Sequence, residues 1–154
     1  GGPVLSALVQ APFVQLDVAA HDWEDAARTA VAPLVGAGLA TQAYVDDIVR
    51  GAKELGPYFV LAPRVAMPHA RPDQGALGNG IGVVRLAEPV EFGSEANDPV
   101  SYLFPLVAAD DGGHLQALMS LAELLSDESF YEGLDKAETA GEVLDLIREK
   151  EGGL

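Results

Sequence analysis

The sequence predicts one α/β domain over residues 1–154, in which helices and strands pack in layers. Three observations lead to this fold class. The length of 154 residues suits a single domain. Apolar residues make up 49% of the chain, which is enough to build a packed core. Segments with helical periodicity alternate with short strand-like runs, with no linker or repeat between them, and this favours a layered structure whose strand order stays open.

The first elements are expected to be a strand and a helix. Residues 13–18 alternate in part between apolar and polar side chains, as a half-buried strand does. Asp22 is a suitable N-cap for a helix that begins at Trp23. Pro33 and the stretch 36–38, with its two glycines, are expected to end that helix.

The middle of the chain is expected to form a second helix and three strands. Thr41 could cap this helix and Gly56-Pro57 would stop it, with an apolar face of Tyr44, Val45, Ile48, Val49 and Ala52. Runs rich in strand formers follow at residues 58–62, 81–86 and 100–109. Pro105 lies inside the third run and indicates an edge strand or a bulge, because proline has no backbone donor.

Two helices are expected in the last third of the chain. His114 is expected to begin the first, after a flexible loop at residues 110–113. The apolar side chains of this helix recur at helical spacing, which is more typical of a core than of a binding site, at Leu115, Leu118, Met119, Leu121, Ala122 and Leu125. Thr139 and Glu142 form a capping box for the last helix.

Charge and composition limit the partners. The formal net charge is −15 and only nine Lys and Arg residues are present, so nucleic acid and anionic lipid are poor partners. A basic protein would be attracted, although the acidity could equally serve solubility alone. The absence of cysteine excludes disulfides and thiolate sites, and no apolar run approaches the roughly 18 residues of a membrane span. Gly1-Gly2-Pro3 is interpreted as a cloning remnant rather than a signal peptide.

The strongest candidate for chemistry is His69, which lies between Pro68 and Ala70-Arg71-Pro72. The two prolines restrict the backbone around it and favour a stiff, extended loop. A histidine that accepts a phosphoryl group needs such a fixed position. Its neutral nitrogen must approach the phosphorus atom in line with the bond that breaks. Arg71 could offset the charge of a phosphoryl group on the ring. A turn histidine with no role is the alternative.

His114 is the second candidate. It sits where a helix N-terminus is expected, and free N–H groups there bind anions. A neutral imidazole at that position could donate a hydrogen bond, although a surface histidine at a helix start would look the same. His21 is interpreted as a surface residue, and no histidine pair has metal-ligand spacing, so we expect no metal and no cofactor.

Two other segments are interpreted as structural. The glycines of residues 78–82 resemble a phosphate loop, but Asn79-Gly80 is a turn signal and no Gly-Lys-Ser/Thr follows. Nucleotide binding is therefore not expected. The acidic residues Glu91, Glu95 and Asp98 are expected to be solvated rather than catalytic.

The segment from Glu54 to Pro72 resembles the active-site signature of phosphotransferase-system enzyme IIA components of the mannitol/fructose type, and it is most similar to the L-ascorbate branch. The resemblance covers nearly the whole chain from about residue 10 onward, and continues through residues 88–93, 97–100, 114–118 and 121–127. It implies a single-domain sandwich with a mixed sheet and helices on both faces.

The resemblance also implies a phosphoryl relay. A IIA protein takes the phosphoryl group from the phosphohistidine of HPr and passes it to a IIB cysteine, and the IIC component moves the sugar through the membrane. His69 would carry the group, usually on Nε2, and His114 would bind its oxygens. Lys53 falls where relatives carry a basic residue that stabilises the phosphoryl group, and Arg71 belongs to the ascorbate-like pattern. A cytoplasmic phosphotransferase, peripheral to the transporter, is expected.

Some alternatives stay open. Arg64 stands where a glycine is common in the family, so it could add a cation near the His69 loop. A regulatory module that controls transcription or nitrogen metabolism, a scaffold that has lost phosphorylation, and a metal-dependent hydrolase are the rival functions. The sugar, a homo-oligomeric state and fusion to further domains are left undetermined by the sequence.

Overall fold

The computed structural model describes residues 5–152, and the interpretation of Gly1–Pro3 lies outside that range. Its centre is a mixed five-stranded sheet with the order β1-β5-β6-β3-β2. These strands are β1 (Val14–Val18), β2 (Val60–Ala62), β3 (Val65–Ala66), β5 (Val83–Val90) and β6 (Val100–Leu103). The β1–β5 and β3–β6 pairs are parallel, while β2–β3 and β5–β6 are antiparallel.

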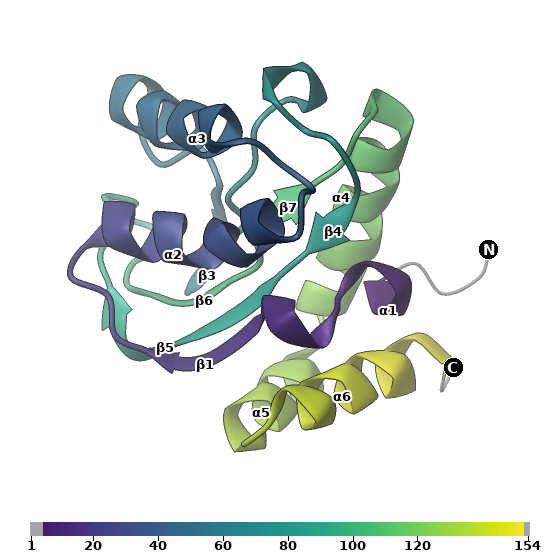
Figure 1. Cartoon of the computed structure of the whole chain (residues 1–154). Helices are drawn as coiled ribbons and strands as arrows, with labels where there is room; N and C mark the ends of the chain where they lie inside the picture. The colour runs from purple at the N-terminus through teal and green to yellow at the C-terminus, as the bar shows by residue number, and fades with distance from the viewer. Residues whose placement is uncertain (1–4, 153–154) are drawn as a thin grey trace.

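Helices cover both faces of this sheet, as the predicted α/β sandwich requires (Figure 1). The helices are α1 (Leu5–Leu8), α2 (Trp23–Gly36), α3 (Gln42–Leu55), α4 (Asp111–Leu125), α5 (Glu128–Lys136) and α6 (Ala140–Gly152). Short 3₁₀ turns, η1 (Ala11–Phe13) and η2 (Pro72–Gln74), complete the elements. The fold prediction is confirmed. Within residues 5–152, no helix is both long enough and apolar enough to span a membrane.

The central strands feed two separate cores. Val84 and Leu103 point into the core beneath α2 and α3, while their neighbours Val83 and Tyr102 point into the core formed with α1, α4, α5 and α6. Successive strand residues face opposite sides of a sheet, so a sheet buried on both faces needs unbroken apolar runs. This explains why residues 81–86 and 100–109 show so little alternation.

Both of those predicted strands are divided in the structure. β4 (Gly80–Ile81) and β7 (Leu106–Val107) form their own antiparallel pair, apart from the main sheet. The breaks fall at Gly82 and Pro105, where Gly82 N donates to Pro105 O at 2.9 Å. A Cβ on Gly82 would lie 2.7 Å from Pro105 Cγ, so only glycine fits. The sequence predicted an edge strand or a bulge at Pro105, whereas the structure ends β6 before Pro105 and begins β7 after it. β3 was not predicted from the sequence.

The expectation that Pro33 ends the first helix is wrong, because α2 continues through it to Gly36. Proline cannot donate to the carbonyl four residues earlier, which here belongs to Thr29. The side chain of Gln15 on β1 satisfies that carbonyl, with Nε2 at 2.9 Å from Thr29 O. The Asp22 cap is confirmed, since its carboxylate accepts from Asp25 N.

The helix after the predicted flexible loop starts earlier than expected. α4 begins at Asp111, and the Asp110 carboxylate caps it by accepting from Gly113 N at 2.7 Å. Residues 110–113 are therefore the ordered start of the helix, and His114 is its fourth residue. Leu115 and Met119 of α4 are 59% and 64% exposed, so the expectation that they belong to the core is also wrong.

Smaller corrections concern caps and the acidic loop. Thr41 precedes α3 as expected, but its hydroxyl caps nothing and is buried without a hydrogen-bond partner within residues 5–152. Gly56 ends α3 with φ +87°, as its position predicts. Asp98 is not simply solvated, because its carboxylate accepts from three consecutive backbone amides, those of Phe92, Gly93 and Ser94. α5 was not predicted.

Candidate functional site

The loop that carries His69 follows β3 and is fixed by backbone hydrogen bonds on two sides. Met67 N donates to Phe59 O at 2.8 Å, which continues the β2–β3 pairing into the loop. On the other side, Leu106 N of β7 donates to Pro68 O at 3.0 Å. Because these bonds come from different elements, the loop is held between the main sheet and the β4–β7 pair. The stiffness expected from the prolines has a structural basis.

Two tyrosine hydroxyls bind the same loop. Tyr44 of α3 is fully buried, and its hydroxyl accepts from Ala70 N at 3.1 Å and lies 2.8 Å from Leu106 O, to which it can donate. Tyr58 donates to His69 O at 2.5 Å. Burial raises the pKa of each tyrosine to about 12, so both hydroxyls keep their protons near neutral pH. Sequence reasoning had treated Tyr44 as core and Tyr58 as a strand residue.

The hydrogen bond of the His69 ring determines its tautomer. Nδ1 lies 2.6 Å from Met67 O, and a carbonyl oxygen can only accept, so Nδ1 carries the hydrogen. The lone pair of the neutral ring is therefore on Nε2, the atom that the family resemblance implies. The ring also packs edge-on against Tyr58, with centroids 5.6 Å apart. This contact restricts rotation of the imidazole.

The structure brings His114 beside His69, which the sequence could not show. The two ring centroids are 5.5 Å apart. His114 Nδ1 is buried and has no hydrogen-bond partner among the described residues. An unpaired buried N–H costs more than an unpaired buried lone pair, so the tautomer with hydrogen on Nε2 is favoured. In that form His114 presents a donor and His69 presents a lone pair.

Both imidazoles are biased toward their neutral forms. Burial, together with the nearby His114, lowers the pKa of His69 below 6.5, against an opposing effect of the Met67 carbonyl. Burial also lowers the pKa of His114, which Asp111 partly offsets. Two neutral histidines side by side suit a nucleophile and a hydrogen-bond donor better than two cations would.

A cavity of about 610 Å³ opens over the histidine pair. Arg71 lines it, as expected for a residue near a phosphoryl group, and makes no ion pair within the described residues. Lys53 does not line it, because its Nζ is paired with Glu24 Oε1 of α2 at 3.0 Å. The second cation of the cavity is Arg50.

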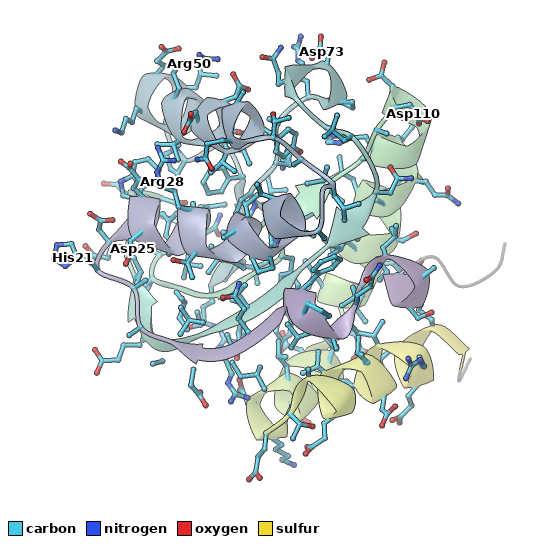
Figure 2. All side chains as sticks on the ribbon, in the orientation of Figure 1. His21, Asp25, Arg28, Arg50, Asp73 and Asp110 are labelled. Atoms are coloured by element: carbon cyan, nitrogen blue, oxygen red, sulfur yellow. The ribbon has the colours of Figure 1, made fainter. Side chains whose placement is uncertain are left out.

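The sequence held a signal for Arg50 that was not used. Asp47, Arg50, Gly51 and Glu54 follow helical spacing along α3, and all four line the cavity. This polar stripe lies beside the apolar face that was used to predict the helix. Figure 2 shows Arg50, Asp73 and Asp110 around one side of the molecule, where α3, η2 and the start of α4 meet.

Arg64 lies elsewhere and adds no cation to the cavity. Its φ is +70°, a conformation that favours glycine and explains why the family often has glycine there. Its guanidinium lies over the Tyr102 ring, 5.6 Å from the centroid. The guanidinium of Arg64 is therefore not among the cations that line the cavity at His69. His21, which precedes the Asp22 cap of α2 (Figure 2), is exposed and does not line the cavity over the histidine pair.

The surroundings of the cavity are acidic on one side and apolar on another. A neighbouring cavity shares Arg71 and His114 and is bordered by Asp73, Asp110 and Asp111. On α4, exposed Leu115 and Met119 line a shallow depression. A protein that docks here would meet apolar side chains and carboxylates beside the two histidines.

Known proteins are similar to this chain in sequence. Residues 7–150 match the family described as phosphoenolpyruvate-dependent sugar phosphotransferase system, EIIA 2. The ascorbate-specific PTS system EIIA component of Salmonella typhimurium is 39% identical over 135 residues, covering 87% of this chain and 88% of its own.

Solved structures agree. The cryptic mannitol-specific phosphotransferase enzyme IIA of Escherichia coli superposes with a TM-score of 0.84 at 34% identity, covering 93% of this chain and 97% of its own. Mannitol enzyme IIA of Escherichia coli, in its complex with phosphorylated mannitol enzyme IIB, superposes with a TM-score of 0.78 at 28% identity, covering 91% and 98%. The chain, with its paired histidines in the family's sandwich fold, belongs to the EIIA type 2 family of the phosphoenolpyruvate-dependent sugar phosphotransferase system.

Proposed function

We propose that this protein carries a phosphoryl group on Nε2 of His69, between HPr and a IIB component, during sugar uptake. The observation that carries the proposal is the 2.6 Å contact between His69 Nδ1 and Met67 O, which leaves the lone pair on Nε2. The transfer itself needs positioning and charge stabilisation more than covalent machinery. The fixed loop and the polar cavity provide both.

Each residue of the site has a specific chemical role in the proposed relay. Nε2 of His69 attacks the phosphorus, the N–P bond of the donor histidine breaks, and the donor keeps that electron pair. His114 donates from Nε2–H to a phosphoryl oxygen. Arg71 offsets the phosphoryl charge, and Arg50 takes the place that the resemblance had given to Lys53. In the second transfer a IIB cysteine thiolate attacks, and the electron pair of the broken N–P bond returns to His69.

The sugar proposed is L-ascorbate or a close analogue. The curated relative from Salmonella typhimurium, 39% identical, is named as ascorbate-specific. The IIB partner is proposed by analogy with the mannitol enzyme IIA, which was solved in complex with phosphorylated enzyme IIB. We expect the relay to run in the cytoplasm, beside the IIC transporter.

Intact-mass measurement tests the carrier role. The protein is incubated with phosphoenolpyruvate, enzyme I and HPr, alongside its His69→Ala and His21→Ala variants. We expect one acid-labile phosphoryl group on the wild type and on His21→Ala, and none on His69→Ala. Absence of the group from the wild type, with several HPr proteins and an intact fold, would overturn the relay and favour a scaffold.

The acceptor distinguishes transport from regulation. The phosphorylated protein is mixed in separate samples with purified IIB components of ascorbate and mannitol systems, and transfer is followed by mass. Fast discharge to the ascorbate-type IIB supports the proposed substrate. Discharge to the mannitol-type IIB alone would contradict ascorbate, and no discharge to any IIB would favour the regulatory alternative.

A further inference from the structure

The charges that line the cavity do not suit tight binding of an anion. Arg50 and Arg71 are its two cations, and Asp47 and Glu54 are its two anions. The neighbouring cavity adds three carboxylates, those of Asp73, Asp110 and Asp111. A phosphoryl group brings about −1.5 to −2 units of charge. Sites that bind such groups tightly normally show an excess of Arg and Lys, which this site lacks.

The two cations are not equally available. Arg71 makes no ion pair among the described residues, whereas Arg50 Nη2 is bound to Asp47 Oδ1, three residues earlier on α3. The Asp47 side chain is 23% exposed and the Arg50 side chain 61%. The carboxylate is therefore the more fixed partner of the pair, and it holds the longer side chain.

Asp47 and the loop that carries His69 line the same cavity. Besides their burial, Asp47 is a cause of the raised pKa of Tyr58 and of Tyr44. These two hydroxyls bind His69 O and Ala70 N. Asp47 is thus an anion in the same cavity as His69.

We propose that Asp47 is a positioning residue that raises the phosphoryl-transfer potential of phosphorylated His69 by restraining Arg50. This inference rests on the proposed function. If Arg50 stays on Asp47, the phosphoryl group loses half of the cationic charge of the cavity. If Arg50 turns to the phosphoryl group, Asp47 is left without its partner near a second anion. Either arrangement makes the phosphorylated form less stable than it would be without the carboxylate.

A loosely held group suits an intermediate carrier. A carrier that stabilised its phosphohistidine strongly would accept the group readily and then release it slowly to the next protein. Asp47 shifts that balance toward release. The Asp47–Arg50 pair therefore sets how long the group stays on His69, while the two histidines and the loop determine where it is attached.

The lifetime of the phosphohistidine tests this inference without any carrier protein. Wild type, Asp47→Asn and Asp46→Asn are phosphorylated with phosphoramidate, a small donor that phosphorylates imidazole. Loss of the group to water is followed by intact mass. Asp46 is the matched control, because it is the adjacent carboxylate on α3 and pairs with Arg28 outside the cavity. Both substitutions remove one negative charge.

We expect Asp47→Asn to lengthen the lifetime about two- to fivefold, the effect of one partly exposed charge, and Asp46→Asn to leave it unchanged. The equilibrium between phosphorylated HPr and this protein should also move toward this protein. Asp47→Ala, which also removes the carboxylate, should lengthen the lifetime in the same way. This second variant keeps the inference testable if Asp47→Asn folds poorly.

The outcomes separate the inference from the proposed function. Equal lifetimes for wild type and Asp47→Asn, an equal increase in Asp46→Asn, or no labelling of His69 by phosphoramidate would each overturn the role of Asp47. A wild type that phosphoramidate labels and HPr does not would contradict the relay, while the lifetimes still decide the role of Asp47.

Discussion

At the scale of single residues, the protonation state of His69 matters most. Its Nδ1–H is bound to a backbone carbonyl, and burial lowers its pKa below the usual 6.5. The same cause lowers the pKa of His114. The folded protein therefore keeps both rings neutral at a pH where unfolded chains would already bind protons.

This predicts a pH dependence of stability with a definite sign. Between the lowered pKa values and 6.5 the unfolded state binds more protons, so the free energy of unfolding should rise as the pH rises through that window. Urea denaturation at several pH values measures the rise, and NMR titration of the imidazole nitrogens measures the midpoints. A His69→Gln/His114→Gln variant should lose the rise, and an unchanged slope in that variant would contradict the assignment.

How much of the site could be predicted depends on the kind of residue. His69 and Arg71 were predicted because prolines and a family signature surround them, and His114 because a helix start was expected nearby. Arg50 was missed because the family resemblance assigned the basic residue to Lys53, one turn later on α3, and Arg50 was not considered. Which of two cations on a helix reaches a cavity depends on the neighbouring helix, and here Glu24 of α2 binds Lys53.

At the scale of elements, α2 shows how a proline is accommodated inside a helix. Pro33 has no backbone N–H to donate to the carbonyl of Thr29, and this carbonyl accepts a hydrogen bond from Gln15 of β1 instead. Sequence rules treat proline as a helix terminator because they consider one segment at a time. Here a side chain from another element supplies the missing donor, so the helix can continue to Gly36.

The Gln15–Thr29 hydrogen bond gives a stability prediction. Gln15→Leu should lower the free energy of unfolding by about 1 kcal/mol, since it leaves a part-buried carbonyl without a donor. In a Pro33→Ala background the helix regains its own backbone donor, so the same substitution should cost much less. Urea denaturation of the wild type, the two single variants and the double variant gives the coupling free energy between the two positions. An equal cost of Gln15→Leu in both backgrounds would show that the two positions are independent.

The elements found and missed follow a physical pattern. Long amphipathic helices such as α3 and α6 were predicted, because one apolar stripe identifies them. The strand β3 was missed, because two residues are too short to show a strand pattern and its parallel pairing with β6 depends on residues far away in the sequence. The divided strands were missed because Gly82 and Pro105 act on each other across the sheet.

At the scale of the whole molecule, the exposed apolar side chains are unevenly placed. Leu115 and Met119 line a depression on the helix that carries His114, and Leu55 lines the cavity over His69. Leu61 is about as exposed as Leu115 but lines neither the depression nor the cavity.

The prediction that residues 1–154 form one domain stays a prediction.

This placement predicts where partner proteins bind. A Leu115→Ser/Met119→Ser variant should raise the KM for phosphorylated HPr about fivefold or more while kcat changes little, because the side chains contribute to docking and not to transfer. The free energy of unfolding should change by less than about 0.5 kcal/mol for each exposed side chain. Steady-state phosphorylation kinetics measure the effect. Leu61→Ser is the control, and an equal increase in its KM would contradict a local docking surface.

The carbonyl of Met67 has one more consequence. On the proposed function, it could hold Nδ1–H of His69 both when Nε2 is free and when it carries a phosphoryl group, because phosphorylation would not change the nitrogen that it binds. The free and phosphorylated forms would then share one loop conformation, and a partner protein would meet the same surface in both. The direction of phosphoryl transfer would then depend on which partner protein is phosphorylated and on the concentration of each partner, and the transfer through this chain would be reversible.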